Sequence, residues 1–279
     1  MNTNLKIKRI TAIAVVLLSI LPANKINAGD DFGVWGSLKA SKKLTEKMKF
    51  EIEGELRTTD GVKEIDRRSV GLSLSYDLLD WLEADIGYVY INSYNPEEKK
   101  IKSESGIDAS FDDYNIDHAY WEKRDRFFFS LNAGWKIGRI KFSLRERLQY
   151  QHTHSEMVYE DKYRWASSGG VNDDGTMNPP ILTTESNVEI KDAKHATLIR
   201  SRLTAKWDIK KCKLAPFASV ELFTRVDEWK GHDKLRYRIG ADYKIDKDNE
   251  VSLYYMFQDN HSSSSPAGHA ICVGYSFDL

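Results

Sequence analysis

Residues 48–57 read MKFEIEGELR, and apolar and charged side chains alternate along them. In a β-strand, successive side chains point to opposite faces, so residues two apart share a face. Phe50, Ile52 and Leu56 therefore lie on one face, and the charged residues lie on the other. One such strand would fit any sheet, so the fold depends on how often the pattern recurs.

The same alternation recurs along the chain, and each run stops at a turn. We expect eleven strands, at residues 32–42, 47–58, 67–78, 81–92, 125–137, 139–152, 196–208, 213–225, 233–245, 249–260 and 268–279. Short turns and longer connections alternate between them, as in outer-membrane barrels, where the short turns are periplasmic and the long loops extracellular. Two connections, 93–124 and 153–195, exceed the usual length of unstructured loops, which predicts that they are functional or mobile.

Alternation alone does not say which face is inside, and three features favour a membrane barrel over a soluble one. Ten or more strands enclose a space too wide for apolar side chains to fill. The strands are as long as tilted membrane strands must be. Aromatic residues lie near the strand ends on the short-turn side, where an interfacial girdle belongs, at Trp81, Trp135, Trp207 and Tyr243. We therefore expect an all-β, antiparallel, up-and-down transmembrane β-barrel with a polar lumen and long extracellular loops.

The number of strands conflicts with one rule. Bacterial single-chain barrels have an even number of strands, and the sequence suggests eleven. The first segment, residues 32–42, is the one in doubt. If this segment is displaced from the wall or wrongly divided, the barrel has ten or twelve strands. We therefore expect 10–12 strands.

The N-terminus resembles a secretory signal. Lys6, Lys8 and Arg9 form a basic region, an apolar stretch follows at residues 10–21, and Ala28 offers a small residue for cleavage. The apolar stretch is too short to span a membrane as a helix. We therefore expect residues 1–28 to be a cleaved signal peptide and residues 29–279 to form a single barrel domain in the cell outer membrane.

The net charge and the cysteines of the chain limit the kinds of partner and cross-link that we expect. The formal net charge is -1, which gives no reason to expect a nucleic-acid partner. The expected partners are outer-membrane lipids, the barrel-assembly machinery during insertion and a small solute that the sequence does not identify. The two cysteines, Cys212 and Cys272, lie in a turn and within the last strand, which favours two free thiols.

Several strand motifs resemble a known family. They are the Trp35 segment, Arg145-x-Arg147-x-Gln149-Tyr150, Arg200-x-Arg202-Leu203, Pro216-Phe217-Ala218-Ser219-x-Glu221-Leu222 and Arg236-Tyr237-Arg238. Together with the signal they resemble the outer-membrane barrels of Gram-negative bacteria grouped as domain of unknown function 2490. The resemblance implies fold and location, and it carries no known activity.

The polar face of the predicted strands is rich in charges of both signs. We expect a lumen charge network of Glu51, Glu53, Glu55, Arg57, Arg126, Arg145, Arg147, Arg200, Arg202, Glu221, Arg236 and Arg238. Guanidinium groups pair with carboxylates in bidentate geometry, so the network would fill and stiffen a narrow lumen. A ladder that selects an anionic solute is the alternative. Glu146 falls on the lipid side, unless a bulge re-aims it.

Two further groups could carry chemistry. His261 and Ser263 lie two apart on one face, and a histidine so placed can activate a serine for acyl hydrolysis. A serine-rich loop explains the same run, so these residues are candidates only. His152, His154, Glu156 and His118 do not make a complete ligand set, so we expect neither a metal site nor a cofactor.

These patterns favour a non-enzymatic, porin-like barrel, either structural or a narrow solute channel with a charged, partly plugged lumen. The alternative is an outer-membrane, lipid-modifying hydrolase that uses His261 and Ser263.

Overall fold

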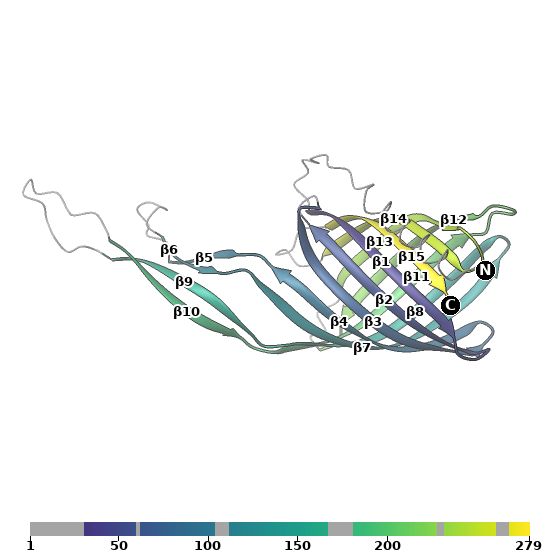
Figure 1. The fold of residues 1–279 in the computed structure, drawn as a ribbon, viewed down its shortest axis with the longest axis horizontal. Helices are drawn as coiled ribbons and strands as arrows, with labels where there is room; N and C mark the ends of the chain where they lie inside the picture. The colour runs from purple at the N-terminus through teal and green to yellow at the C-terminus, as the bar shows by residue number, and fades with distance from the viewer. Residues whose placement is uncertain (1–30, 60–61, 104–111, 167–180, 228–231, 261–267) are drawn as a thin grey trace, which may run out of the picture.

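The computed structural model describes residues 31–59, 62–103, 112–166, 181–227, 232–260 and 268–279 (Figure 1). The strands are β1 (Asp31–Lys43), β2 (Met48–Thr59), β3 (Glu64–Leu79), β4 (Leu82–Asn95), β5 (Glu98–Ser103), β6 (Asp113–Asp117), β7 (Tyr120–Ile137), β8 (Ile140–Thr153), β9 (Glu156–Ala166), β10 (Ile181–Lys191), β11 (Lys194–Trp207), β12 (Leu214–Arg225), β13 (His232–Lys244), β14 (Asn249–Asn260) and β15 (Gly268–Asp278). Among the described residues, no helix is long and apolar enough to cross a membrane.

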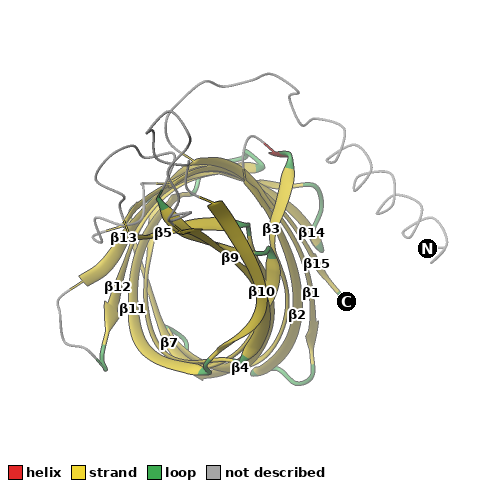
Figure 2. Ribbon diagram, turned by 90° about the vertical axis from the view of Figure 1, so that its left-hand side faces the viewer, coloured by secondary structure: helices red, strands yellow, loops and turns green. Residues whose placement is uncertain are grey.

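Eleven of the described strands close a barrel in the order β1-β15-β14-β13-β12-β11-β8-β7-β4-β3-β2. Figure 2 looks along the barrel from the long-loop end and shows this ring. All neighbours pair antiparallel except β1 and β15, which run parallel from Asp31 opposite Gly268 to Ser41 opposite Asp278. The expected barrel is confirmed.

The expectation that the first segment leaves the wall, or is wrongly divided, is wrong. β1 pairs with β2 on one side and with β15 on the other, so it is a full wall strand. A strand edge exposed to lipid would leave backbone groups without partners. With an odd number of strands, the closing pair must be parallel to satisfy both edges.

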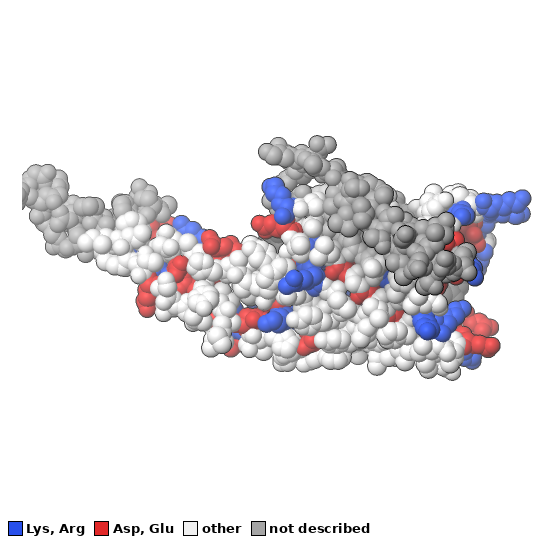
Figure 3. Space-filling model, in the orientation of Figure 1, with Lys and Arg blue, Asp and Glu red and all other residues white. Residues whose placement is uncertain are grey.

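The outward face of the barrel is apolar. Ile52, Leu56, Phe127 and Phe129 are all exposed, which is the reverse of a soluble protein, where such residues are buried. In Figure 3 the lower wall is largely uncharged, and charged groups gather at the right-hand end, where the short turns lie. The expected girdle residues are exposed there as well, at Trp81, Trp135, Trp207 and Tyr243.

Glu146 is an exception on this outward face, but it is not on a bulge. β8 pairs with β7 and β11 without any register shift near Glu146. The side chain stays on the outer face and accepts a hydrogen bond of 2.6 Å from the Ser201 hydroxyl on β11. A bulge is therefore ruled out, and a neighbouring hydroxyl partly satisfies the carboxylate.

The segments 93–124 and 153–195 are not simply loops. They contain β5, β6, β9 and β10, which form a four-stranded sheet in the order β10-β9-β6-β5 that projects from the long-loop end (Figure 1). We call this sheet the extension. Its central pairing joins the two segments, with Tyr114 opposite Tyr163 and their rings stacked 4.6 Å apart.

Part of the barrel interior is apolar. Met256, Ala270 and Cys272 are buried on β14 and β15, with Trp35 and Tyr254 packed against them. Both cysteines are free thiols, with Cys212 exposed and Cys272 buried. This apolar contact between β1, β14 and β15 supports the parallel closure from inside.

One glycine on β13 permits close packing inside the wall. A Cβ added at Gly240 would lie 2.3 Å from the Leu253 carbonyl oxygen and 2.3 Å from Tyr254 Cβ. Both atoms belong to β14, the strand next to β13. Only a residue without a side chain fits this position while the two strands keep their spacing.

Candidate functional site in the charged lumen

A single buried carboxylate organises the middle of the lumen. Glu221 on β12 has no exposed surface, and Arg145 Nη2 donates to its Oε1 over 2.6 Å. Arg200 donates to the same oxygen through Nη2 at 2.8 Å and Nε at 3.2 Å. Arg238 Nη2 donates to Oε2 over 2.7 Å, and Arg236 Nη1 lies 3.8 Å from it. We call these five residues the Glu221 cluster.

Strand register brings the Glu221 cluster together. Glu221 lies opposite Arg202 on β11 and opposite Arg236 on β13. In each Arg-x-Arg motif the two arginines share the inward face, and β13 supplies both Arg236 and Arg238 to the cluster, whereas β11 supplies Arg200. Arg145 reaches Glu221 from β8, two strands away from β12.

Charge in the Glu221 cluster is unbalanced. Hydrogen bonds between guanidinium and carboxylate are among the strongest in proteins. One carboxylate nevertheless faces four guanidinium groups, all on side chains that are mostly buried. The cluster therefore holds the lumen together through Glu221 and leaves an excess of positive charge around it.

The other expected network residues have mixed partners. Glu55 pairs with Arg57 over 2.8 Å, whereas Glu51 pairs with two lysines, Lys49 at 2.8 Å and Lys39 at 3.7 Å. Arginine and carboxylate thus pair directly in only part of the expected network.

Two expected arginines bond mainly to neutral groups. Arg126 donates to the Gln151 side-chain oxygen over 3.1 Å. Arg147 donates to the Ser130 hydroxyl over 2.7 Å and lies 3.6 Å from the Asp85 carboxylate. Glu53 and Arg202 line a cavity below the Glu221 cluster.

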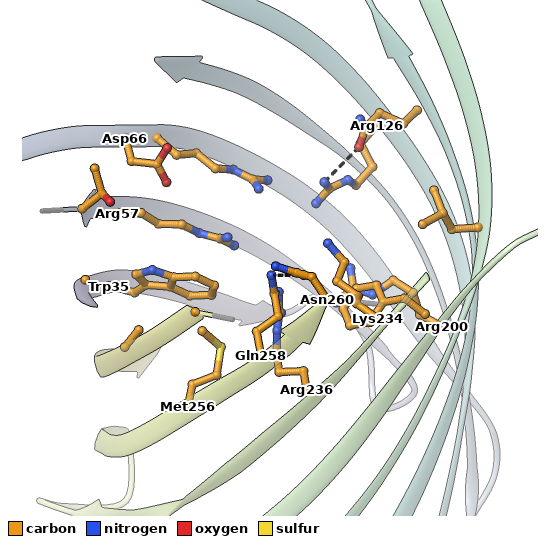
Figure 4. A pocket seen from close by; sticks show the side chains of 18 of the residues that line it. Trp35, Arg57, Asp66, Arg126, Arg200, Lys234, Arg236, Met256, Gln258 and Asn260 are labelled. Carbon is orange, nitrogen blue, oxygen red and sulfur yellow. Dashed lines mark hydrogen bonds between the residues drawn. The ribbon is translucent and has the colours of Figure 1, made fainter. Parts of the chain in front are cut away.

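A cavity of about 510 Å³ lies toward the long-loop end, and we call it the upper cavity. Figure 4 shows Arg57, Arg126, Arg200, Lys234 and Arg236 around it, on strands from several sides of the barrel. In the described part of the chain, the lining carries one carboxylate, that of Asp66, and eight cationic side chains, which are Arg57, Arg67, Arg124, Arg126, Arg200, Arg225, Lys234 and Arg236.

A second cavity of about 410 Å³ lies toward the short-turn end, and we call it the lower cavity. Its lining mixes both signs, with Lys39, Lys49, Arg145, Arg147 and Arg202 beside Glu51, Glu53, Glu83 and Asp85. Among the residues that the structure describes, none lines both cavities. Glu221 bonds to Arg200, which lines the upper cavity, and to Arg145, which lines the lower one. The Glu221 cluster therefore stands between them.

The sequence analysis missed several lumen residues. Arg67 on β3 and Arg124 on β7 line the upper cavity, and Asp85 on β4 lines the lower one. Arg67 shares the polar parity of Ser69, and Arg124 shares that of Arg126, so the same alternation could have found both. Alternation did not identify Trp35 as a lumen residue, because the pattern assigns apolar side chains to the outer face and Trp35 faces inward.

The hydrolase candidates, His261 and Ser263, lie outside the described residues. His152 and His154 lie at the long-loop end of β8, and their rings are 4.8 Å apart. His195 on β11 joins them, with its Nδ1 3.2 Å from His152 Nδ1, while His154 Nε2 lies 2.6 Å from the Asp125 carboxylate. These side chains form a row on the outer face, with ring contact between His152 and His154 and hydrogen bonds to His195 and Asp125.

The remaining two residues of the predicted histidine group lie elsewhere. Glu156 pairs with Lys123 over 3.2 Å. His118 pairs with Asp161 in the extension, over 2.9 Å. The four side chains therefore do not form one ligand set.

The extension holds a compact acidic group. Asp117, Glu160 and Glu189 each place one oxygen within 4.8 Å of the others. Lys191 Nζ lies 2.9 Å from Asp117 and 2.5 Å from Glu189, and Lys100 Nζ lies 2.7 Å from Asp117. Burial raises the pKa of the Asp117 carboxyl, but the hydrogen bonds from the two lysines outweigh burial and hold that pKa below its usual value. Lys100 and Lys191 therefore supply the positive charge that a metal ion would otherwise supply to these three carboxylates.

Comparison with known proteins identifies one family. The family model described as "Protein of unknown function (DUF2490)" matches residues 32–268. No curated protein matches the sequence.

Two solved structures are similar in outline. The β domain of the Bordetella autotransporter BrkA is 10% identical, with 84% of this chain and 85% of that chain covered and a TM-score of 0.46. The translocator domain of the autotransporter NalP from Neisseria meningitidis is 12% identical, with 94% and 95% covered and a TM-score of 0.45.

Proposed function

This chain belongs to the DUF2490 family, whose description assigns no activity, and we propose that it is a narrow, anion-preferring channel of the outer membrane, partly plugged at the Glu221 cluster. The single observation that carries the proposal is the position of that cluster between the two cavities. A solute that passes from one cavity to the other must pass its side chains.

The surface supports the membrane part of this proposal. An apolar outer face and a charged interior suit a barrel surrounded by lipid and filled with polar groups and water. The chain would reach a Gram-negative outer membrane by the predicted signal at residues 1–28. It would insert with the barrel-assembly machinery, with outer-membrane lipids around its wall.

The charge of the Glu221 cluster supports the selectivity. Rings of arginine or lysine are the usual lining of anion-conducting pores. Here Arg145, Arg200, Arg236 and Arg238 surround one carboxylate, so a cation at this level meets net repulsion and an anion meets attraction. We therefore assign the Glu221 cluster as the constriction that limits both the size and the charge of the solute.

The alternative functions make different predictions. A structural barrel would have the Glu221 cluster closed to all ions. The hydrolase alternative depends on His261 and Ser263, for which no described geometry gives support.

Single-channel recording in planar bilayers tests the proposal. The parent protein is expected to give small, steady unitary currents. Glu221→Gln removes the common anchor of four arginines, so the constriction loosens and the unitary conductance rises. Glu146→Gln, the same substitution on the outer face, is the matched control and is expected to leave the conductance unchanged. Silence from correctly inserted parent protein would overturn the channel and favour a structural barrel.

A further inference from the structure

We propose that the upper cavity is a binding site for a compact multivalent anion, one that carries at least three negative charges on phosphate or carboxylate groups. This deepens the proposed function, because the same cavity would be the entrance of the channel. Binding there does not require conduction, so the two ideas can fail separately.

The first argument is the charge of the lining. Of the described residues, eight with cationic side chains and one with a carboxylate line the upper cavity. Glu55, Glu122 and Glu221 pair with some of these cations, namely Arg57, Arg124, Arg200 and Arg236. With those three carboxylates and that of Asp66 counted, eight cations face four carboxylates in the described part of the lumen. The lower cavity, which mixes acids and bases almost evenly, shows no such excess.

The second argument is hydrogen-bonding capacity left over inside the barrel. The Nε atoms of Arg67, Arg126 and Arg236 are buried and have no hydrogen-bond partner among the described residues. Arg236 is itself only 7% exposed. Buried polar groups are almost always bonded in native proteins, so these donors are available to an acceptor that enters the cavity. An anion with several oxygens supplies acceptors of the right charge.

The third argument is the rigidity of the cationic groups. Trp35 lies beneath the Arg57 guanidinium at 3.6 Å and within 5.3 Å of that of Arg236. Phe223 holds Arg200 at 4.6 Å and Arg236 at 4.9 Å. Stacking on an aromatic ring fixes the plane of a guanidinium and leaves its edge free to donate. These arginines are therefore oriented before a ligand arrives, which reduces the entropy cost of binding.

Size and access fit a small ligand. A volume of about 510 Å³ lies within the usual range of small-molecule sites, roughly 300–1,000 Å³. Asn260 and Lys234 are among the lining residues near the strand ends on the long-loop side, so the cavity reaches that end of the barrel. Guanidinium groups match phosphate and carboxylate oxygens in bidentate geometry.

Calorimetric titration of the full-length protein in detergent tests the proposal, with sodium tripolyphosphate as the first probe. Saturable binding at one site is expected, and it should weaken as salt rises because the interaction is electrostatic. Citrate is the second probe, and its binding relative to tripolyphosphate distinguishes carboxylate from phosphate chemistry within the proposed class. Orthophosphate is the third probe and should bind much more weakly. Equal binding of orthophosphate would overturn the requirement for several charges.

Two matched variants locate the site. Arg126→Gln removes one charge from the upper cavity without removing the partner of a carboxylate, because Arg126 bonds to Gln151. We expect it to weaken tripolyphosphate binding at least about tenfold, which corresponds to about 1.4 kcal/mol. Arg202→Gln makes the same change in the lower cavity and should alter binding less than about threefold.

The outcomes separate the two proposals. The heat-dependent gel shift of folded barrels confirms that each variant is folded. Equal weakening by Arg126→Gln and Arg202→Gln, or no binding to the parent, would overturn the anion site. A silent bilayer with intact tripolyphosphate binding would overturn the channel and leave the site standing.

Discussion

Glu221→Gln is the substitution whose energetic consequence follows most directly from the lumen. The carboxylate accepts hydrogen bonds from Arg145 and Arg200 on one oxygen and from Arg238 on the other. Glutamine keeps one acceptor and replaces the second with an NH2 group, which faces a guanidinium donor. Removing one partner of a buried ion pair costs about 3–5 kcal/mol. We expect the free energy of unfolding to fall by about this amount.

Equilibrium unfolding in urea from lipid vesicles measures this change, with tryptophan fluorescence as the probe. Glu53→Gln is the matched control, because Glu53 lines the lower cavity and is exposed. An exposed substitution usually changes stability by less than about 0.5 kcal/mol. The double variant Glu221→Gln/Arg238→Gln should recover part of the loss, because it removes one of the uncompensated cations.

The reasoning would be refuted by a loss in Glu221→Gln smaller than about 1 kcal/mol, a typical value for one neutral hydrogen bond. A double variant less stable than Glu221→Gln alone would also refute it. In either case Glu221 would not anchor the lumen arginines.

Three further predictions concern the wall and the extension. Gly240→Ala should destabilise the barrel by about 1–3 kcal/mol in the same urea assay, because its Cβ meets the backbone of β14, whereas Gly54→Ala, whose Cβ meets nothing within 4 Å, should have little effect; equal effects would contradict the packing argument. Deletion of residues 98–117 and 156–191 should leave a folded barrel with the usual gel shift. Asn95 already pairs with Tyr120 in the wall, and Thr153 pairs with Lys194, so the barrel strands are joined without the extension. Failure to fold would show that the extension is needed for closure. Because the pKa of Asp117 is lowered in the folded protein, its stabilising contribution is present at neutral pH and is lost as the pH falls below about 4. The protection factors of the β6 amides, which are exchange rates corrected for the pH dependence of exchange in a free amide, should therefore fall on acidification. They should already be lower in Asp117→Asn at pH 7. Protection factors of the parent that do not change with pH would contradict this.

The inward and outward faces of the wall follow from local sequence, and the partnerships across the lumen do not. Alternation assigns each residue to one of two faces, and the strand number, the strand length and the aromatic residues at the strand ends indicate which face is outward. Ile52 and Phe127 therefore face outward, and Arg145 and Arg200 face inward. Which arginine meets which carboxylate depends on register between strands and on contacts such as that of Arg145 on β8 with Glu221 on β12. Nothing in the sequence near Glu221 marks it as the acceptor for several arginines.

The parallel pair that closes the barrel and the extension were not predictable for a related reason. The pairing of β1 with β15 joins the two ends of the described chain, and the pairing of β6 with β9 joins two separate connections. Such contacts have no local signature. The extension strands β5 and β6 are also short, at 6 and 5 residues, so alternation gives little signal there.

The reversal potential of the parent protein in a planar bilayer, under a gradient of potassium chloride, tests the central claim most directly. A constriction with one carboxylate among four arginines must favour chloride over potassium. The account predicts a reversal potential shifted toward the chloride equilibrium potential. A shift toward the potassium equilibrium potential would contradict it.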